Sequence, residues 1–445
     1  MTIQSNFKGK KITVMGLGLL GRGVNDVKFL AENGADLIVT DLKTREELAP
    51  SIAQLTQYKN ITYVLGEHRL EDFRDRDLII KMASVPLDSI YTNEAKKNGI
   101  PVEMSTALFA RLTEATVVGI TGTRGKSTVT HLLYEILKSA FSDRQIFIGG
   151  NIKGMSTLPL LDEAKKGDIA VLELDSWQLQ GFGESKLSPH VAIFTTFYND
   201  HLNYYKNDLD SYLADKANIF LSQKPEDFLV LGSQASEIVL SKYKNEIESK
   251  IIIPEATIGS EIKTKLLGEH NKYNIALAIE GARIFGVKED VIKKVVEDFK
   301  GVPFRLELVR TIAGVNIYND TTATTPEATI AGLEALNKNI ILIMGGTDKN
   351  LDMTKLISTI PKYCKEVIVL SGTGTERIKN DLVGFVKNIP VTFCTSLDEA
   401  VKEALKSAKS GDSLLFSPAF ASFGMFKNEF DRGEKFNKIV LDICQ

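Results

Sequence analysis

The chain has 445 residues, of which 43% are hydrophobic and 25% charged, a composition typical of globular proteins and a length suited to about three domains. Its net charge of −3 gives no electrostatic reason to expect nucleic acid or an anionic membrane as a partner, so an anionic ligand needs a local site. The three widely spaced cysteines indicate reduced thiols, and no signal-peptide core or membrane-spanning segment is visible. We therefore expect a cytoplasmic protein that neither enters a membrane nor binds nucleic acid.

Strands rich in β-branched residues alternate with helical patterns through nearly the whole chain, which predicts α/β domains with mainly parallel sheets. We predict three domains, at residues 1–104, 105–301 and 302–445. The link before the third domain contains Pro303, which discourages helix continuation.

The first domain opens with a predicted strand at residues 11–15, a glycine-rich turn and a helix at residues 24–33. The turn, Gly16-Leu-Gly-Leu-Leu-Gly21, is followed about 20 residues later by Asp41 at the end of the next strand, as in nucleotide-binding Rossmann-like domains. Glycines also occur in many strand–helix turns that bind nothing, so the pattern favours a nucleotide without proving one. Further strands are predicted at residues 61–64 and 78–82.

The second domain carries the most informative motif, Gly119-Ile-Thr-Gly-Thr-Arg-Gly-Lys-Ser-Thr128, between a predicted strand at residues 116–120 and an amphipathic helix. Backbone N–H groups of such a turn converge on phosphate oxygens at the positive helix end. Lys126 supplies positive charge for the outer phosphates, and the Ser127 hydroxyl is placed to hold Mg²⁺. The motif departs from the strict pattern, which has glycine where this chain has Ile120. We predict a nucleoside triphosphate site, with a tight turn that binds nothing as the alternative.

Two more strands of this domain, predicted at residues 169–174 and 191–197, run into polar residues. Glu173 lies near the end of the first, where a carboxylate beside a triphosphate suits Mg²⁺, although pairing with a neighbouring arginine is also open. His201 follows the second strand as a metal ligand, a general base or a hydrogen-bonded loop residue. Lys216 lies on an ordinary amphipathic helix, and the pattern alone assigns it no role. The domain continues with a helix at residues 210–220, a strand at 228–231, a charged solvated segment at 242–250 and helices at 273–284 and 292–299.

Strands in the third domain alternate with helices and predict another Rossmann-like sheet. They lie at residues 315–318, 340–344, 366–370, 391–393 and 413–416. The motif Gly345-Gly-Thr-Asp-Lys-Asn350 is a second glycine turn with a lysine after a strand, and hydroxyl-rich turns at residues 319–326 and 417–422 also follow strands.

As a set, these motifs resemble the Mur ligase superfamily over the whole chain. The matching patterns are Thr-Gly-Thr-x-Gly-Lys-Ser-Thr, Leu-Glu-Leu-x-Ser-x-Gln-Leu, Asp-His, Gly-x-His-Asn-x-x-Asn and Gly-Gly-x-Asp-Lys, and residues 417–433 are similar to the branch that adds D-glutamate. The resemblance implies a UDP-sugar-binding Rossmann-like domain, a central ATPase domain and a C-terminal domain that brings the amino acid. It implies a monomeric ligase of peptidoglycan precursor synthesis that joins D-glutamate to UDP-N-acetylmuramoyl-L-alanine through an acyl phosphate, with ATP.

The resemblance also implies roles for individual residues. Those implied to contact ATP are Gly122, Thr123, Arg124, Gly125, Lys126, Ser127, Thr128, Asn271, Arg305 and Asp320. Those implied to be catalytic are Lys126, Glu173, His201 and Lys216. Two Mg²⁺ ions are implied at Ser127, Glu173, His201 and Lys216, the last carbamylated by CO₂, which turns a cation into an anionic ligand. Substrate contacts are implied at Gly18, Leu19, Leu20, Asp41, Ser84, Asn151, Thr324, Lys349, Ser422 and Phe423.

Some positions depart from the family pattern. Thr322 stands where the family has a lysine, Glu429 where it has a phenylalanine, and Thr196 where it has an asparagine. A related ligase with another amino acid or acceptor is therefore an alternative. A nucleotide-binding relative without catalysis is a second, but it would not need residues for a second metal. A nicotinamide-dependent dehydrogenase would leave the phosphate loop unexplained.

Overall fold

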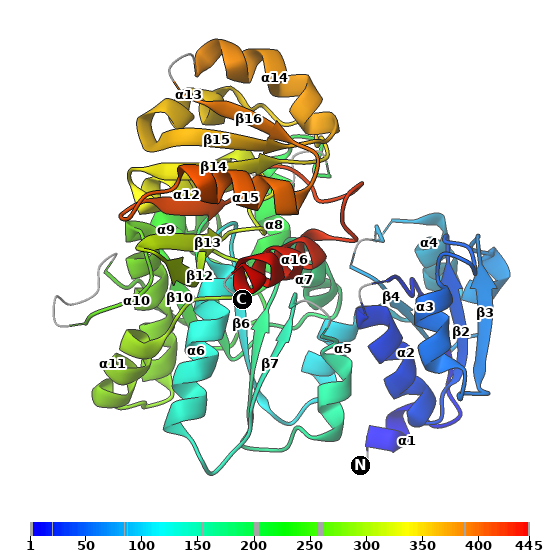
Figure 1. Cartoon of the computed structure of the whole chain (residues 1–445). Helices are drawn as coiled ribbons and strands as arrows, with labels where there is room; N and C mark the ends of the chain where they lie inside the picture. The colour runs from blue at the N-terminus through cyan, green and yellow to red at the C-terminus, as the bar shows by residue number, and fades with distance from the viewer. Residues whose placement is uncertain are drawn as a thin grey trace. The chain divides into compact units, whose positions relative to one another are not determined.

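The computed structural model describes residues 3–19, 21–83, 85–86, 88–152, 155–199, 204–255, 262–386 and 389–443. They form two compact units, one of Met1–Ile262 and Tyr273–Val296, the other of Lys263–Lys272 and Glu297–Gln445. Figure 1 shows three sheets, in blue, in cyan to green, and in yellow to orange. The expected α/β class with mainly parallel sheets is confirmed.

The first sheet is parallel, with the strand order β3-β2-β1-β4-β5. Its strands are β1 (Lys11–Met15), β2 (Asp36–Asp41), β3 (Ile61–Leu65), β4 (Leu78–Lys81) and β5 (Val102–Glu103). The accompanying helices are α1 (Ile3–Phe7), α2 (Arg22–Glu32), α3 (Ala49–Ile52) and α4 (Ile90–Lys97), with short 3₁₀ turns η1 (Ala53–Leu55) and η2 (Leu70–Phe73). The order is Rossmann-like and reverses between β1 and β4, so the turn after β1 opens on the crevice where such sheets bind ligands.

The second sheet is also parallel, with the order β11-β10-β9-β6-β8-β7. Its strands are β6 (Thr116–Thr121), β7 (Ile146–Gly150), β8 (Ile169–Glu173), β9 (Val191–Phe194), β10 (Phe228–Leu231) and β11 (Lys250–Ile252). Its helices are α5 (Ser105–Leu112), α6 (Lys126–Ala140), η3 (Leu158–Asp162), α7 (Ser176–Glu184), α8 (Leu209–Ala217), α9 (Ser233–Tyr243), α10 (Glu269–Ile284) and α11 (Glu289–Asp298). Strand β8 is buried along its whole length, which explains its nearly unbroken apolar run. The phosphate-loop strand β6 lies between β8 and β9, so polar residues at the ends of these neighbours come close to the loop.

The third sheet has the order β12-β13-β17-β14-β15-β16. Its strands are β12 (Glu307–Ile312), β13 (Val315–Asn319), β14 (Ile340–Gly345), β15 (Cys364–Leu370), β16 (Val391–Cys394) and β17 (Ser413–Phe416). Its helices are α12 (Pro326–Leu336), α13 (Thr354–Tyr363), α14 (Thr373–Phe385), α15 (Leu397–Ser407) and α16 (Glu429–Asp442). Only the edge strand β12 pairs antiparallel among the described strands of this sheet.

The first two sheets share one apolar core within the first unit. Val27 and Leu30 of α2 belong to the same buried cluster as Leu158 and Leu161 of η3, and the two elements are in contact. The domain boundary near residue 104 therefore runs through packed structure and stays a prediction.

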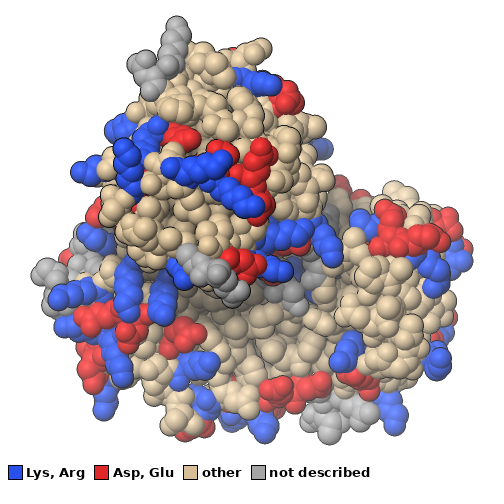
Figure 2. Space-filling view, viewed as in Figure 1, with Lys and Arg blue, Asp and Glu red and all other residues tan. Residues whose placement is uncertain are grey.

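The surface seen in Figure 2 carries interspersed basic and acidic side chains, in keeping with the small net charge. Within the described part of the chain, no helix has both the length and the apolar content needed to cross a bilayer.

Candidate active site

The loop between β6 and α6 depends on two glycines with positive φ, Gly122 at 138° and Gly125 at 87°. A Cβ at Gly122 would lie 2.0 Å from Thr195 Oγ1, and one at Gly125 would lie 2.3 Å from Asn274 Oδ1. Neither position has room for a side chain. Gly125 is also the N-cap of α6 and supplies no side-chain cap, so first-turn N–H groups remain for an anion.

Two threonines directly after β9 hold the loop in this shape. The Arg124 N–H donates to Thr196 Oγ1 at 2.9 Å, and both threonine hydroxyls donate to Arg124 O. The Thr123 N–H donates to Thr196 O at 2.7 Å. Thr196, where the family pattern has asparagine, is thus a brace for the phosphate loop. Sequence reasoning gave neither threonine a role, although their place at a strand end beside the loop strand was a usable signal.

Two lysines far apart in sequence converge on one carbonyl of this loop. Lys126 Nζ donates to Gly122 O at 3.0 Å and to Thr123 O at 3.1 Å. Lys216 Nζ, from α8, donates to Gly122 O at 3.0 Å and to Thr121 Oγ1 at 3.4 Å. Lys216 is 1% exposed. The structure therefore places a buried amine beside the loop, which no property of α8 itself had indicated.

Glu173 closes β8 directly beside the loop strand, in register with Ile120. The residue is only 4% exposed, yet among the described residues no hydrogen-bond donor or cation contacts its carboxylate. A carboxylate at this place is available to a cation, and a hard divalent ion suits it. The described residues contain no ready-made group of three His, Cys, Asp or Glu side chains that could hold a metal. His201, the other predicted ligand from this region, lies outside the described residues.

Asn151 follows β7 at the same sheet edge, and its N–H donates to Glu173 O at 2.7 Å. Its side-chain oxygen accepts from Arg22 Nη2 at 3.3 Å, and the same nitrogen reaches Gly150 O and Ile152 O at 3.3 Å. Arg22 begins α2, directly after the first glycine turn. It therefore ties that turn to the ligand edge of the second sheet, a link that sequence reasoning missed.

The first glycine turn is braced by Asp41. One carboxylate oxygen accepts the N–H groups of Leu17 at 2.8 Å and Gly18 at 3.0 Å, and the other accepts that of Lys43 at 2.9 Å. Leu19, within the turn, is 51% exposed. Asp41 therefore shapes the turn through its own hydrogen bonds. The predicted contacts Leu20 and Ser84 lie outside the described residues.

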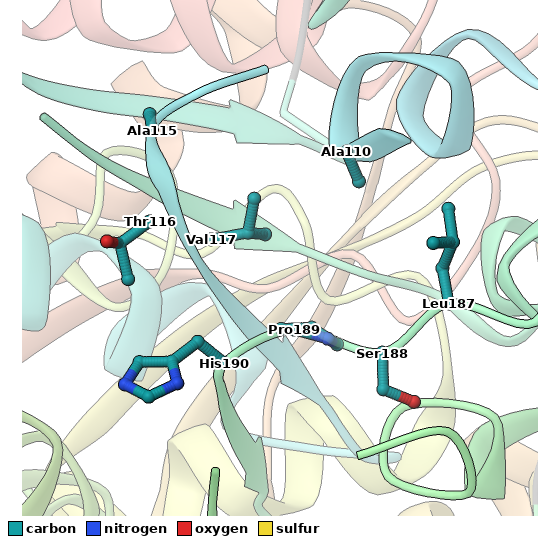
Figure 3. Close-up of a pocket in the computed structure, with 8 residues that line it drawn as sticks. All are labelled: Ala110, Ala115, Thr116, Val117, Leu187, Ser188, Pro189 and His190. Carbon is teal, nitrogen blue, oxygen red and sulfur yellow. The ribbon is translucent and has the colours of Figure 1, made fainter. Parts of the chain in front are cut away.

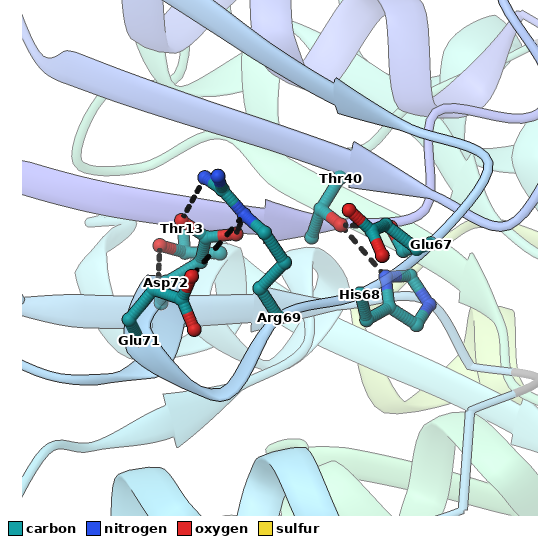
Figure 4. Close-up of polar contacts among 7 residues, drawn as sticks. All are labelled: Thr13, Thr40, Glu67, His68, Arg69, Glu71 and Asp72. Carbon is teal, nitrogen blue, oxygen red and sulfur yellow. Dashed lines mark hydrogen bonds and ion pairs between the residues drawn. The ribbon is translucent and has the colours of Figure 1, made fainter.

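Polar contacts continue along the end of β2 (Figure 4). Thr40 Oγ1 donates to Glu67 O at 3.0 Å and lies 2.7 Å from His68 Nδ1. Burial lowers the pKa of His68, which favours the neutral ring. Arg69 forms a paired contact with Asp72 at 2.9 and 2.7 Å, which fixes the loop that follows β3.

The predicted residues of the second unit gather at the ends of β13, β14 and β17. Asp320 accepts from Ser417 Oγ at 2.8 Å and from the Leu306 N–H at 3.0 Å. Burial raises the pKa of Asp320 to about 7, although these donors and the charge of Arg305 act in the opposite direction. Asn271 lies in the same unit, where its side chain donates to the Leu267 carbonyl.

The predicted amino-acid residues lie nearby in that unit. Lys349 Nζ donates to Thr324 Oγ1 at 3.1 Å and to Thr324 O at 3.3 Å. Ser422 is buried, whereas Phe423 is 62% exposed. Arg432 of α16, which sequence reasoning did not select, is fully buried under the segment that carries Ser422.

A pocket also lies at the opposite edge of the second sheet (Figure 3). Thr116 opens β6 and His190 precedes β9, so their shared pocket is at the amino-terminal edge, away from the phosphate loop. His190 Nδ1 lies 2.7 Å from Asp227 Oδ1 and is part of a structural contact.

Comparison with known proteins covers all three sheets. The chain matches the family models for the Mur ligase MurD-like N-terminal domain at residues 10–103, the Mur ligase middle domain at 120–251 and the Mur ligase glutamate ligase domain at 304–420. A UDP-N-acetylmuramoylalanine–D-glutamate ligase of Roseiflexus sp. (strain RS-1) is 37% identical over 97% of this chain and 98% of that protein. A protein of the same name from Borreliella afzelii (strain PKo) is 36% identical, again over 97% and 98%.

Among solved structures, the fold is shared with the UDP-N-acetylmuramate–alanine ligase of Thermotoga maritima. The TM-score is 0.61 at 21% identity, and the match covers 98% of this chain and 100% of that one. The MurF ligase of the same organism has a TM-score of 0.58 at 17% identity, covering 100% and 98%. By its family models and its nearly full-length relatives, this chain belongs to the Mur ligase family.

Proposed function

We propose that this chain joins D-glutamate to UDP-N-acetylmuramoyl-L-alanine in peptidoglycan precursor synthesis, with ATP as phosphoryl donor. The two relatives described above are named for that ligation and match nearly the whole chain. The observation that carries the ATP assignment is the phosphate loop, whose two glycines have no room for a side chain and whose first-turn N–H groups lack a side-chain cap. In this proposal residues 1–104 bind the UDP-sugar, 105–301 bind ATP and 302–445 bring the amino acid.

The chemistry follows from the weak reactivity of a carboxylate toward an amine. Transfer of the γ-phosphoryl group to the L-alanyl carboxylate gives an acyl phosphate and ADP. The D-glutamate amine then attacks the acyl carbon, a proton is lost, and phosphate leaves as the amide forms. Both reacting groups are anionic, so Lys126 supports the reaction by moving from its loop carbonyls to the transferring phosphoryl group.

Two Mg²⁺ ions fit this site in the proposal, held by Ser127, Glu173, His201 and a carbamylated Lys216. The bound ions supply charge neutralisation between the carboxylate and the triphosphate. The buried Glu173 carboxylate, which no described donor or cation contacts, supports this assignment. Burial of Lys216 within reach of the loop supports the carbamate, since that modification replaces a buried cation by a metal ligand.

The remaining predicted contacts complete the proposal. The N–H groups of the first glycine turn, with Leu19, receive the UDP moiety, and Asp41 keeps the turn in shape. Asn151 meets the sugar-peptide part. Contacts to the incoming amino acid come from Thr324, Lys349, Ser422 and Phe423. Because both nucleotide substrates are cytoplasmic metabolites, we place the enzyme in the cytoplasm and propose that it acts as a monomer.

The test is Mg²⁺-dependent phosphate release from ATP in the presence of UDP-N-acetylmuramoyl-L-alanine, with amino acids of both chiralities. We expect stimulation by D-glutamate, none by L-glutamate, and none when the UDP-sugar is omitted. Stimulation by a different amino acid would replace the proposed substrate while keeping the reaction. No stimulation by any amino acid would refute ligase activity with this acceptor.

A further inference from the structure

Arg432 is a buried cation that forms no ion pair with any residue that the structure describes. It is 1% exposed, and its guanidinium donates to Thr321 Oγ1 at 2.9 Å, Thr321 O at 2.8 Å and Phe420 O at 3.2 Å. All three acceptors are neutral. Among the described residues, no carboxylate lies within ion-pair distance of it. A guanidinium has five N–H donors, so part of its donor capacity is left over. Its positive charge faces the Phe416 ring, whose centroid lies 6.0 Å from Arg432 Cζ, and this contact compensates a buried charge only weakly.

Burial is unfavourable for the charged form and lowers the pKa of Arg432 to about 10, although the charge of Glu429 acts in the opposite direction. The group remains a cation at neutral pH. A fold that keeps a charge in this condition gains when an anion binds nearby, because the anion restores part of the lost solvation.

Arg432 also lines a small cavity within the second unit. The other lining residues come from the glycine turn after β14, from Leu370 and from residues 421–426, which include Ser422. The Ser422 side chain is 3% exposed. A cation, a hydroxyl and a glycine turn thus meet at the end of the third sheet, where the proposed amino-acid residues lie.

The family pattern has a lysine at the position of Thr322, so this chain lacks a positive charge there. Thr322 stands in place of that lysine, and its hydroxyl donates to Phe304 O at 2.8 Å. Arg432 holds the adjacent residue, Thr321, through both its hydroxyl and its carbonyl. The buried guanidinium is therefore a source of positive charge beside the position that lacks one.

We propose that Arg432 determines specificity for an amino acid with a side-chain carboxylate, by placing a fixed positive charge behind the cavity that Ser422 lines. This inference rests on the proposed ligase function and deepens it. The charge of Glu429 acts on Arg432, and Glu429 stands where the family has an apolar residue. Glu429 therefore opposes the selection that Arg432 makes, and the two charges can be varied independently.

The experiment uses the full-length enzyme and three variants. Arg432→Met removes the charge at similar volume, Arg432→Lys keeps the charge but loses the planar fork, and Glu429→Gln removes the opposing charge. For each we measure kcat/KM for an acidic amino acid and its neutral amide, D-glutamate and D-glutamine, together with the KM for ATP. Thermal unfolding reports whether each variant is folded.

We expect Arg432→Met to lower the acidic-to-neutral preference by about tenfold or more, the scale on which a nearby charge stabilises an anion. Arg432→Lys should retain most of the preference even if kcat falls, and Glu429→Gln should increase it through a lower KM for D-glutamate. The KM for ATP should stay unchanged. A merely structural role would lower turnover with both amino acids equally.

An unchanged preference in folded Arg432→Met would overturn the inference. If that variant does not fold, an unchanged preference in Glu429→Gln overturns it instead. Failure of the proposed function has a different signature. If the wild type uses another acidic amino acid, the proposal of D-glutamate as the substrate is wrong. The role of Arg432 is then tested with that acid and its neutral amide. Use of neutral amino acids only, or of none, would refute both.

Discussion

Replacing Asp41 by asparagine tests whether the first glycine turn is shaped by a carboxylate before any ligand arrives. The side chain accepts three backbone N–H groups, two of them on one oxygen. In Asp41→Asn the remaining oxygen can keep the Leu17 and Gly18 donors. The new NH₂ group then faces the Lys43 N–H, so one hydrogen bond is lost and the other two lose their charge.

The expected cost follows from those contacts. A hydrogen bond to a charged group contributes about 1.5–3 kcal/mol, and neutral ones about half as much. Losing one and weakening two therefore destabilises the bound shape of the turn by about 3–6 kcal/mol, and the lower end of that range corresponds to roughly 150-fold weaker binding. We expect titration calorimetry with UDP to show this loss, while ATP binding at the phosphate loop is unchanged.

Amide hydrogen exchange distinguishes bracing from direct ligand contact. In the unliganded variant the Leu17 and Gly18 amides should exchange faster than in the wild type. The matched control is Asp75→Asn, an exposed aspartate that contacts Lys11 Nζ at 2.6 Å at the other edge of the sheet. UDP affinity within twofold of the wild type would refute the bracing role. Weaker affinity with unchanged exchange would show that Asp41 acts by touching the ligand.

Three further outcomes are expected. Lys126→Ala should reduce phosphate release by about 100- to 1000-fold and leave UDP binding intact. Lys138 is exposed on the same helix, so Lys138→Ala should leave phosphate release unchanged. Normal turnover in Lys126→Ala would refute the loop assignment. Lys216→Ala should be inactive and bicarbonate depletion should slow the wild type, and indifference to both would exclude a carbamate. Asp26 is a buried residue of α2, and its burial raises the pKa from 3.8 to about 6, so the folded state holds its proton more tightly than the unfolded chain does. This contribution, about 3 kcal/mol, is present below pH 4 and lost as pH rises through 6, and urea unfolding of Asp26→Asn should lack that dependence.

Elements with strong local signals were predictable from the sequence. Strands β8 and β14 are continuous apolar runs because both of their faces are covered, and the glycine turns follow strands where positive φ is needed. Four strands were missed. β5 has only two residues, which is too short for an alternating pattern to be visible. β7 has only three apolar residues before two glycines, β11 lies in a charged segment that we predicted to be solvated, and β12 is a half-exposed edge strand with polar residues. Pairing and packing against neighbouring strands stabilise these strands, and their own residue pattern contributes less.

The candidate site was predictable only where its chemistry is local. The phosphate loop carries its own signature, but Lys216 lies on an ordinary helix and reaches Gly122 O from 94 positions away. Arg22 and Arg432 likewise form hydrogen bonds with residues distant in sequence. No window of neighbouring residues contains such contacts. The resemblance alone singled out Lys216, it included Arg432 in a motif without giving it a role, and no signal indicated Arg22.

At two positions that depart from the family pattern, Thr196 and Thr322, the structure shows which contacts the substituted side chain makes. Thr196 binds the Arg124 backbone with its hydroxyl, so its short side chain serves the loop itself. Thr322 bonds the carbonyl of Phe304, a residue with φ of 66°, and so stabilises a strained link. Thr322 carries no positive charge, but the buried Arg432 donates to the carbonyl of the preceding residue, Thr321. At these positions the hydroxyls of the substituted threonines make hydrogen bonds to nearby backbone groups, and a buried arginine lies beside the position that lacks the lysine.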